Sequence, residues 1–210
     1  MRQPKEIEPT PNTKGARSRE HVLEAALRII ATSGMEAVTY RCVADEAGLT
    51  RGAVAHHFPS REQIILNAFR HYIETVDASL SQISEGLGDD SIEGVIELLV
   101  RYHQREFRNP ARVLAEYELI LFAARNEAVG REVRSWEHAL IDRLESRLNR
   151  AGADQPYQSA QLLLAVFRAF ELDSLTGRDN NPDELRTRLQ ALFPAKTRKS
   201  RMTTSNGAKA

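Results

Sequence analysis

The chain of 210 residues holds one cysteine and no apolar run of membrane-spanning length. A single cysteine excludes an intramolecular disulfide and suits a reducing compartment. A transmembrane helix needs about 20 consecutive apolar residues, so none is predicted, and the polar N-terminus lacks the core of a signal peptide. The formal net charge is zero, which weakens the electrostatic attraction expected of a non-specific nucleic-acid binder. These absences predict a soluble protein that stays in the cytoplasm and does not engage a membrane.

Sequence motifs for catalysis and for cofactor binding are also missing. There is no G-x-S-x-G, P-loop, G-x-G-x-x-G or H-E-x-x-H. His56 and His57 are adjacent, so on a helix they point about 100° apart and cannot readily share a metal ion. His103 and Glu106 lie one helical turn apart, as in di-iron bundles, but a second Glu-x-x-His is absent. We therefore expect no enzyme, no cofactor and no metal site, with a helical-bundle enzyme as a remote alternative.

The most informative stretch of the sequence runs from Val38 to Phe58. Thr39 precedes an apolar pattern of helical spacing and has the chemistry of an N-cap, and Thr50 can cap a second helix in the same way. Gly48 between them supplies the backbone freedom that ends the first helix, and Leu49 is expected to be buried at the corner. Two short helices joined by a glycine-containing turn form a helix-turn-helix, whose second helix enters the DNA major groove. An ordinary helical hairpin in an all-α domain is the alternative.

The sequence on both sides of this motif agrees with one family. From Arg17 to Ile65 the chain resembles the N-terminal DNA-binding domain of the tetracycline-repressor (TetR) family. The matching features, in order, are Ala25-Ala26, Ile29-Ile30, Gly34, Val38-Thr39, Val43-Ala44, Ala47-Gly48-Leu49-Thr50, Gly52, His57-Phe58 and Ser60-Arg61-Glu62. The chain departs from the family pattern at Tyr40, at Cys42, which weakens the N-terminal cap, and at Ala55, where the second helix usually carries an aromatic residue.

The motif and the resemblance together imply which residues contact double-stranded DNA. Arg51 opens the second helix, where its guanidinium can bind the O6 and N7 of guanine. Arg61 should instead meet a phosphate, and Arg41 can do either. The full set of expected DNA-binding residues is Thr39, Tyr40, Arg41, Thr50, Arg51, Gly52, Ala53, His56, His57 and Arg61. A dimer of such motifs predicts a palindromic operator as the DNA partner.

The remaining sequence predicts helices and no strand, so we expect an all-α fold of about nine helices. Residues 1–13 are polar and proline-rich and indicate a disordered arm. Residues 14–60 form the three-helix, helix-turn-helix domain, and residues 61–85 form a connecting helix that alone spans the two parts of the molecule. Residues 86–194 form a C-terminal helical bundle for ligand binding and dimerisation. Residues 195–210 carry five basic and no acidic residues and indicate a disordered basic tail.

The helix expected from Tyr157 to Thr176 is apolar on nearly every side. A helix that is apolar all round must be buried all round, so a second copy of the chain is expected to cover part of it. A central core helix of a monomer is the alternative. The resemblance favours the homodimer, formed through residues 156–176 and 182–193. Within this region Arg168 and Glu171 are candidates for inward-facing polar groups of a ligand site, and the alternative is an ion pair at i, i+3 spacing.

A small-molecule site is expected among aromatic and polar residues that surround the C-terminal core. An apolar cavity with a few convergent polar groups is typical of such sites, although each residue alone is more often plain core. The candidates are Tyr72, His103, Tyr117, Phe122, Arg125, Trp136, Phe167 and Phe170. The sequence thus predicts a cytoplasmic homodimeric transcription regulator, most simply a repressor that responds to a small-molecule effector. A DNA-binding regulator without an effector is the main alternative.

Overall fold

The structure, a computed structural model, describes residues 14–194, and within that range it contains nine α-helices, one short 3-10 helix and no strand. The all-α fold with about nine helices is therefore confirmed. The predicted arm at 1–13 and the predicted tail at 195–210 lie outside the described residues. The helices are α1 (Lys14–Ser33), α2 (Tyr40–Ala47), α3 (Arg51–His57), α4 (Arg61–Leu87), α5 (Ile92–Glu106), α6 (Pro110–Ala123), α7 (Glu127–Arg150), α8 (Pro156–Leu175) and α9 (Pro182–Gln190), with the 3-10 helix η1 (Met35–Ala37) between α1 and α2.

Helices α2 and α3 begin and end where the local chemistry of the sequence predicts. The Thr39 side chain accepts a hydrogen bond from the Cys42 amide at 3.1 Å, and Thr50 accepts one from the Ala53 amide at 3.2 Å. Gly48 ends α2 with φ 66° in the left-handed region, which an L side chain adopts only with strain. Leu49 is half-buried rather than buried, because the corner after Gly48 lies at the edge of the small α1–α3 core.

The α1–α3 core holds the two short helices against α1. Val22, Ala26 and Ile30 of α1 are fully buried, as are Val43 of α2 and Val54 of α3. Their burial contributes on the order of 25 cal/mol for each Å² of apolar surface removed from water. This packing stabilises helices of eight and seven residues that are too short to be stable alone.

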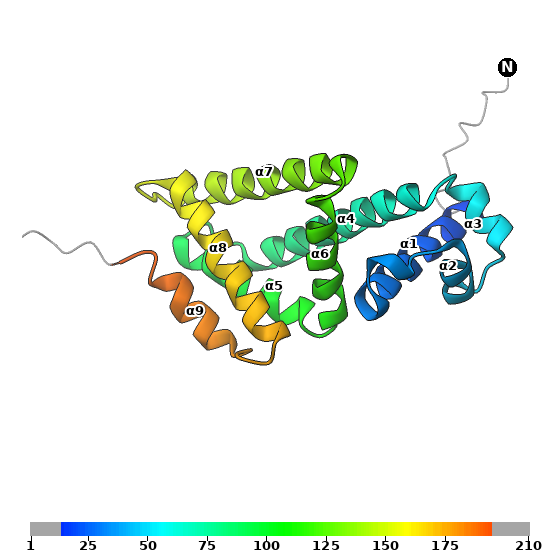
Figure 1. The fold of residues 1–210 in the computed structure, drawn as a ribbon. Helices are drawn as coiled ribbons and strands as arrows, with labels where there is room; N and C mark the ends of the chain where they lie inside the picture. Colours follow the sequence, from blue (N-terminus) through cyan, green and yellow to red (C-terminus); the bar gives the residue numbers. More distant parts are fainter. Residues whose placement is uncertain (1–13, 195–210) are drawn as a thin grey trace, which may run out of the picture.

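Helix α4 connects the α1–α3 end of the molecule to the remaining helices (Figure 1). Ser60 caps it by accepting from the Gln63 amide at 3.2 Å, and Gly88 ends it at φ 58°. Its 27 residues span roughly 40 Å at 1.5 Å per residue. A second connection was not predicted: α1 also packs against α6. The two ends of the molecule are therefore joined through α4 and through the α1–α6 contact.

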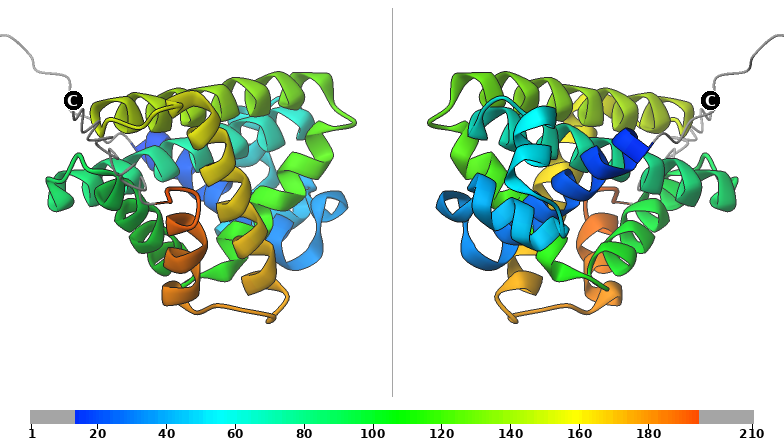
Figure 2. Two further views of the ribbon diagram at one scale, coloured as in Figure 1. Left: turned by 90° about the vertical axis from the view of Figure 1, so that its left-hand side faces the viewer. Right: turned by 90° about the vertical axis from the view of Figure 1, so that its right-hand side faces the viewer.

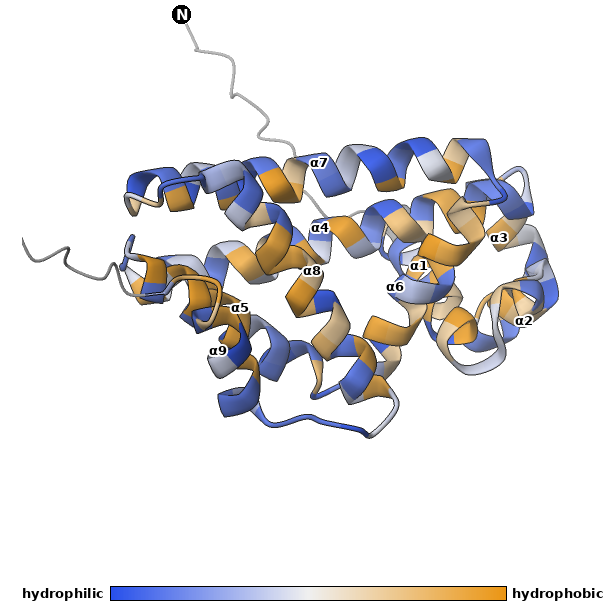
Figure 3. Cartoon of the chain, turned by 60° about the vertical axis from the view of Figure 1, so that its left-hand side comes forward, coloured by the Kyte–Doolittle hydropathy of each residue, from blue (hydrophilic) through white to orange (hydrophobic). Residues whose placement is uncertain are grey.

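The last five helices surround the C-terminal part of the hydrophobic core. Helix α8 leaves the end of α7 at a steep angle to it, and α9 lies against α5 (Figures 1 and 2). Leu163, Phe167 and Phe170 of α8 are buried in this core. On the other side of the same helix Leu162 is 53% and Leu172 47% exposed, and apolar residues recur along α8 in Figure 3. Helix α8 is therefore apolar on several sides, as predicted, but one of those sides is uncovered in the single chain.

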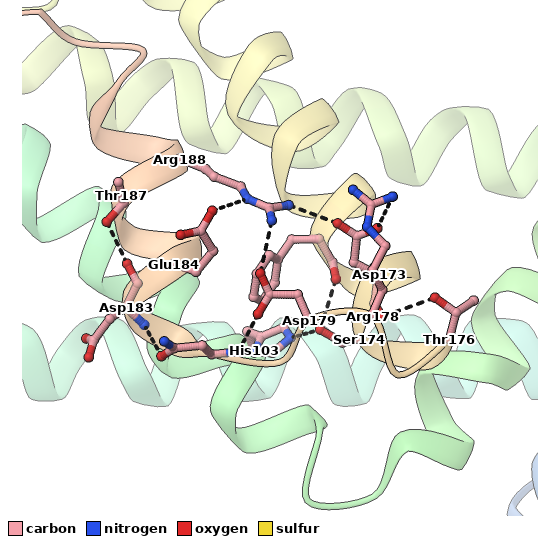
Figure 4. A network of polar contacts seen from close by, with 12 residues as sticks. His103, Asp173, Ser174, Thr176, Arg178, Asp179, Asp183, Glu184, Thr187 and Arg188 are labelled. Carbon is pink, nitrogen blue, oxygen red and sulfur yellow. Dashed lines mark hydrogen bonds and ion pairs between the residues drawn. The ribbon is translucent and has the colours of Figure 1, made fainter.

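Helix α9 is fastened to the end of α8 by the polar network in Figure 4. The Arg188 guanidinium of α9 donates to Asp173 at 2.9 Å, to Asp179 at 3.0 Å and to Glu184 at 2.9 Å. Leu185 of the same helix is fully buried in its own chain. Among the residues from 14 to 194, no helix is both long enough and apolar enough to cross a membrane.

Candidate nucleic-acid interface and ligand cavity

Helix α3 presents small and basic residues to solvent while its other side is anchored. Arg51, Gly52 and His56 are exposed, whereas Ala53 and His57 are half-buried. Val54 on the opposite side of the helix is fully buried. A rigidly seated helix with small exposed residues permits close approach to a major groove, and the exposed guanidinium and imidazole are donors that can contact base edges.

Helix α2 contributes a second exposed surface, of a different character. The Arg41 side chain is 73% exposed and lies 3.7 Å from the Asp45 carboxylate, a separation that leaves it free to move to another anion. Tyr40 is half-buried, and its hydroxyl donates to the Phe58 carbonyl oxygen at 2.7 Å. Tyr40 thus ties α2 to the end of α3, so the residue that departs from the family pattern has a structural role here.

Arg61 takes up a position that differs from the phosphate contact expected from the sequence. Its Nε donates to the Val38 carbonyl at 2.8 Å and its Nη2 to the Met35 carbonyl at 2.7 Å. These bonds hold the start of α4 against the segment that precedes α2, and they occupy the guanidinium on the protein itself. The phosphate contact expected from the sequence would have to compete with these bonds, so we expect a structural role for Arg61 instead.

A cavity of about 360 Å³ lies among the helices of the C-terminal part. Its volume falls at the small end of the range of about 300–1,000 Å³ for ligand pockets. Residues of α4, α5, α6, α7 and α8 line it: Val76, Asp77, Leu80, Ser81, Ser84, Glu85, Leu98, Leu99, Tyr102, Glu116, Trp136, Leu140, Arg143, Leu144, Arg147, Leu164, Phe167, Arg168 and Glu171. Six of these residues belong to α4, the helix that leads to the DNA-binding end.

Two of the eight residues expected at a ligand site, Trp136 and Phe167, line this cavity. The other six do not line it. Tyr72 is buried, with its ring edge-on to Trp136, and the Tyr117 hydroxyl donates to the Arg168 carbonyl oxygen of α8 at 3.2 Å. Phe122 is half-buried and Arg125 is exposed, because both lie where α6 ends and the chain turns into α7.

The two remaining candidates form a separate cluster beneath the end of α8. His103 stacks on Phe107 with ring centroids 4.2 Å apart, and its Nε2 lies 3.1 Å from the Ser174 hydroxyl. Phe170 packs edge-on against the same imidazole, 5.0 Å away. Burial lowers the pKa of His103 to about 4, so the ring is neutral near pH 7. In the described range no group of three possible ligands could hold a metal ion.

The most unusual residues of the cavity are two buried glutamates. Glu116 is 5% and Glu171 3% exposed. Glu116 accepts a hydrogen bond from the Tyr72 hydroxyl, and Glu171 accepts one from Tyr117 at 3.0 Å. Burial raises the pKa of Glu116 to about 7 and the pKa of Glu171 well above its ordinary range, the latter also because of the Glu116 charge. At least part of this pair is protonated at neutral pH when the cavity holds no cation.

Sequence reasoning missed Glu116 as a site residue. Arg168 and Glu171 face the cavity, as one of their two expected roles required, and the alternative ion pair between them does not form. The Arg168 guanidinium donates to Glu137 of α7 at 2.6 Å, rather than pairing with Glu171 three residues on. The signal for Glu116 was present, since this glutamate stands at helical spacing from the buried Val113 and Leu119. A charged residue within an apolar helical stripe indicates either a surface position or a buried site, and the sequence does not distinguish the two.

Comparison with known proteins agrees with both parts of the fold. Residues 22–68 match the family described as "Bacterial regulatory proteins, tetR family", and residues 89–195 match "Tetracyclin repressor-like, C-terminal domain". The chain is 30% identical over 153 residues to the uncharacterised HTH-type transcriptional regulator YfiR of Bacillus subtilis, covering 71% of this chain and 72% of that protein. It is 27% identical over 167 residues to the HTH-type transcriptional repressor KstR of Mycobacterium tuberculosis, covering 79% and 74%.

A solved structure with the same fold was obtained with a small molecule. It is a transcriptional regulator from Saccharomonospora viridis in complex with choline, with a TM-score of 0.70 and 19% identity, covering 86% of this chain and 97% of that one. The matches to both halves of the chain describe regulators rather than enzymes. The protein therefore belongs to the TetR family of DNA-binding transcriptional regulators.

Proposed function

We propose that the protein is a homodimeric repressor that acts in the cytoplasm, binds a palindromic operator through α2 and α3, and leaves it when a small molecule occupies the cavity. The observation that carries the proposal is that one helix, α4, both packs against α1 of the DNA-binding end and lines the cavity. The similarity to a repressor supports the sign of regulation, and the choline complex supports the use of this fold to hold an organic molecule.

The proposed DNA contacts are divided between base recognition and positioning. Arg51 at the first turn of α3 is exposed and has no side-chain partner among the interactions of the described residues, so it is the candidate for guanine recognition. Arg41 of α2 and Thr39 at the N-terminus of that helix lie where they can contact the phosphate backbone of the DNA. Selection of bound sequences from a random DNA pool, followed by footprinting, tests this assignment. Recovery of a two-fold symmetric site supports it, and recovery of no preferred sequence rejects it.

The proposed dimer uses the uncovered side of α8. Leu162, Leu172 and the intervening Ala165 and Ala169 are exposed along that side, and two-fold pairing would bury them against the same residues of a second copy. Helix α9 is the other helix expected at this interface. Its Leu185 and Leu189 are buried inside their own chain, so α9 would contribute polar residues to the dimer interface. Sedimentation of the wild-type protein as a monomer at micromolar concentration would reject the dimer.

The effector is proposed to act by binding one arrangement of α4 more tightly than another. A ligand shifts such an equilibrium only by its difference in affinity for the two states, and coupling energies of about 1–3 kcal/mol change DNA affinity roughly 5–150-fold. A ligand that raises the melting temperature and weakens operator binding in that range supports the proposal. Ligands that stabilise the free protein and leave operator affinity unchanged would favour a regulator without an effector.

A further inference from the structure

The cavity combines a partly open, mostly apolar volume with two buried acidic side chains. Glu116 and Glu171 both line it, and each is at least nine-tenths buried. The positive side chain beside them, Arg168, is already paired with Glu137 at 2.6 Å. Burying a charge without a partner is costly, so these carboxyl groups ionise more readily when something positive enters the cavity.

The groups that face Glu116 come from each of the helices packed around it. They are Tyr72 of α4, Tyr102 and Glu106 of α5, Glu137 of α7, and Arg168 and Glu171 of α8. Tyr117 of α6 also faces Glu116. A second arginine, Arg112, lies 3.7 Å from Glu106, so Arg112 and Arg168 each have an acidic partner. When all the carboxyl groups are ionised, there are two more carboxylates than guanidiniums in this group. The carboxylates are Glu106, Glu116, Glu137 and Glu171, and the guanidiniums are Arg112 and Arg168.

The walls of the cavity are suited to the rest of such a ligand. Tyr102, Trp136 and Phe167 contribute aromatic rings to the lining, and aromatic faces attract organic cations. Trp136 is 5% exposed, and its Nε1 has no hydrogen-bond partner among the described residues. The Arg168 Nη2 is likewise buried without an acceptor. Each unpartnered buried donor is costly, so the ligand should also carry a hydrogen-bond acceptor.

We infer that the cavity takes an amphipathic organic cation, with its positive group held by Glu116 and Glu171 and an acceptor oxygen directed at Trp136 or Arg168. The inference rests on the proposed function only for the consequence of binding, namely release from the operator. The rival is an organic acid held by Arg168 or by Arg147, which also lines the cavity and donates to the Ser84 hydroxyl. At Arg168 the acid is less favourable because that guanidinium already has a carboxylate partner and two further glutamates lie beside it.

Proton exchange distinguishes the two ligand classes. Because burial raises the pKa of both glutamates, a bound cation stabilises their ionised forms and expels protons. Affinity for a cation should therefore increase as pH rises from about 6 to 8, and affinity for an acid should decrease over the same range. Calorimetry in two buffers with different ionisation enthalpies measures the number of protons released.

A matched set of probes tests the inference on the full chain. The probes are 2-phenoxyethyltrimethylammonium, its uncharged carbon isostere 3,3-dimethylbutyl phenyl ether, and the anion 2-phenoxyethanesulfonate, each at up to millimolar concentration. We expect the cation alone to raise the melting temperature strongly and to release protons. Glu116→Gln should weaken its binding at least tenfold and reduce proton release. Glu118→Gln, a change on the same helix outside the cavity lining, should alter neither.

The possible outcomes separate the cation site from ligand-responsive regulation. Tighter binding of the sulfonate, equal binding of the uncharged ether, or binding of none of the three would overturn the inference of a cation site. If the sulfonate or the ether releases operator DNA, the regulator is ligand-responsive and only the cation assignment fails. If the cation binds with proton release but leaves operator affinity unchanged, the cation site stands and ligand-responsive regulation fails. If Glu116→Gln does not fold, the pH dependence of the affinity of the wild-type protein for the three probes still distinguishes a cation site from a site for an organic acid.

Discussion

Replacing Arg61 by alanine is expected to loosen the start of α4 rather than to remove a DNA contact. Its guanidinium donates to the carbonyl oxygens of Val38 and Met35 at 2.8 and 2.7 Å, and the side chain is 27% exposed. The Glu36 carboxylate, 3.4 Å away, is 92% exposed and adds little. The two main-chain bonds join α4 to the segment that positions α2.

The size of the effect follows from these two bonds. A hydrogen bond to a charged group contributes about 1.5–3 kcal/mol, and partial exposure of Arg61 lets water replace part of it. We therefore take the low end for each bond and expect Arg61→Ala to lower the free energy of unfolding by about 2–3 kcal/mol. For a chain of this size, 1 kcal/mol lowers the melting temperature by about 2–4 °C, so the expected fall is roughly 4–12 °C.

Thermal unfolding followed by circular dichroism measures this loss, and operator binding as a function of salt measures any phosphate contact. Removing one phosphate contact lowers the salt slope by about 0.9, so an unchanged slope is expected for Arg61→Ala at a temperature where the variant is folded. Arg51→Ala is the matched control, because an exposed arginine should leave stability within about 0.5 kcal/mol and cost about 1–3 kcal/mol of operator binding with relaxed base preference. An unchanged melting temperature with a lower salt slope for Arg61→Ala would refute the structural role and restore the phosphate contact.

Three further predictions follow from the packing. On α8, Leu162→Glu should give a folded monomer with weak operator binding, whereas Phe170→Glu should misfold because Phe170 is fully buried; sedimentation and circular dichroism separate these outcomes, and a dimeric Leu162→Glu would reject the interface. The hydrogen bond to Glu24, 2.8 Å away on α1, raises the pKa of His71. Because solvent screens this half-buried pair, His71→Gln should cost only about 0.5–1 kcal/mol of stability near pH 6, and progressively less as pH rises through the raised pKa; a cost independent of pH between 6 and 8 would contradict this. Val54→Ala should lower the free energy of unfolding, measured in urea, by about 1.5–3 kcal/mol, and a loss below 0.5 kcal/mol would contradict the packing of α3 against the core.

The interface between the two ends of the molecule shows how a contact can be invisible to sequence reasoning. The sequence predicts α4 as the connecting helix, because one apolar stripe continues from Ile65 to Val76. It does not predict the packing of α1 on α6, since the apolar faces of both helices are equally consistent with burial inside their own domains. Pairing of helices far apart in the chain depends on the three-dimensional arrangement and leaves no local signal.

The sequence by itself determined the helices and their ends, because caps and periodicity are local. Thr39, Thr50 and Ser60 each accept the amide hydrogen bond expected of an N-cap, and Gly48 takes the left-handed conformation. It also determined the helix-turn-helix, since that motif is a run of adjacent residues. The exposure of Gly52 and His56 follows from the same periodicity, because Val54, two residues from each, must face the core.

The tertiary structure alone decided the roles of polar side chains. A guanidinium reaches whichever acceptor the fold brings near, so Arg61 bonds main-chain carbonyls 23 and 26 residues away in sequence, and Arg168 pairs with Glu137 across two helices. Burial of Glu116 and Glu171 depends likewise on how five helices close around one cavity. From the sequence alone, a charged residue in a helix is expected to face solvent. Only the packing of the neighbouring helices shows that such a residue is buried in a cavity.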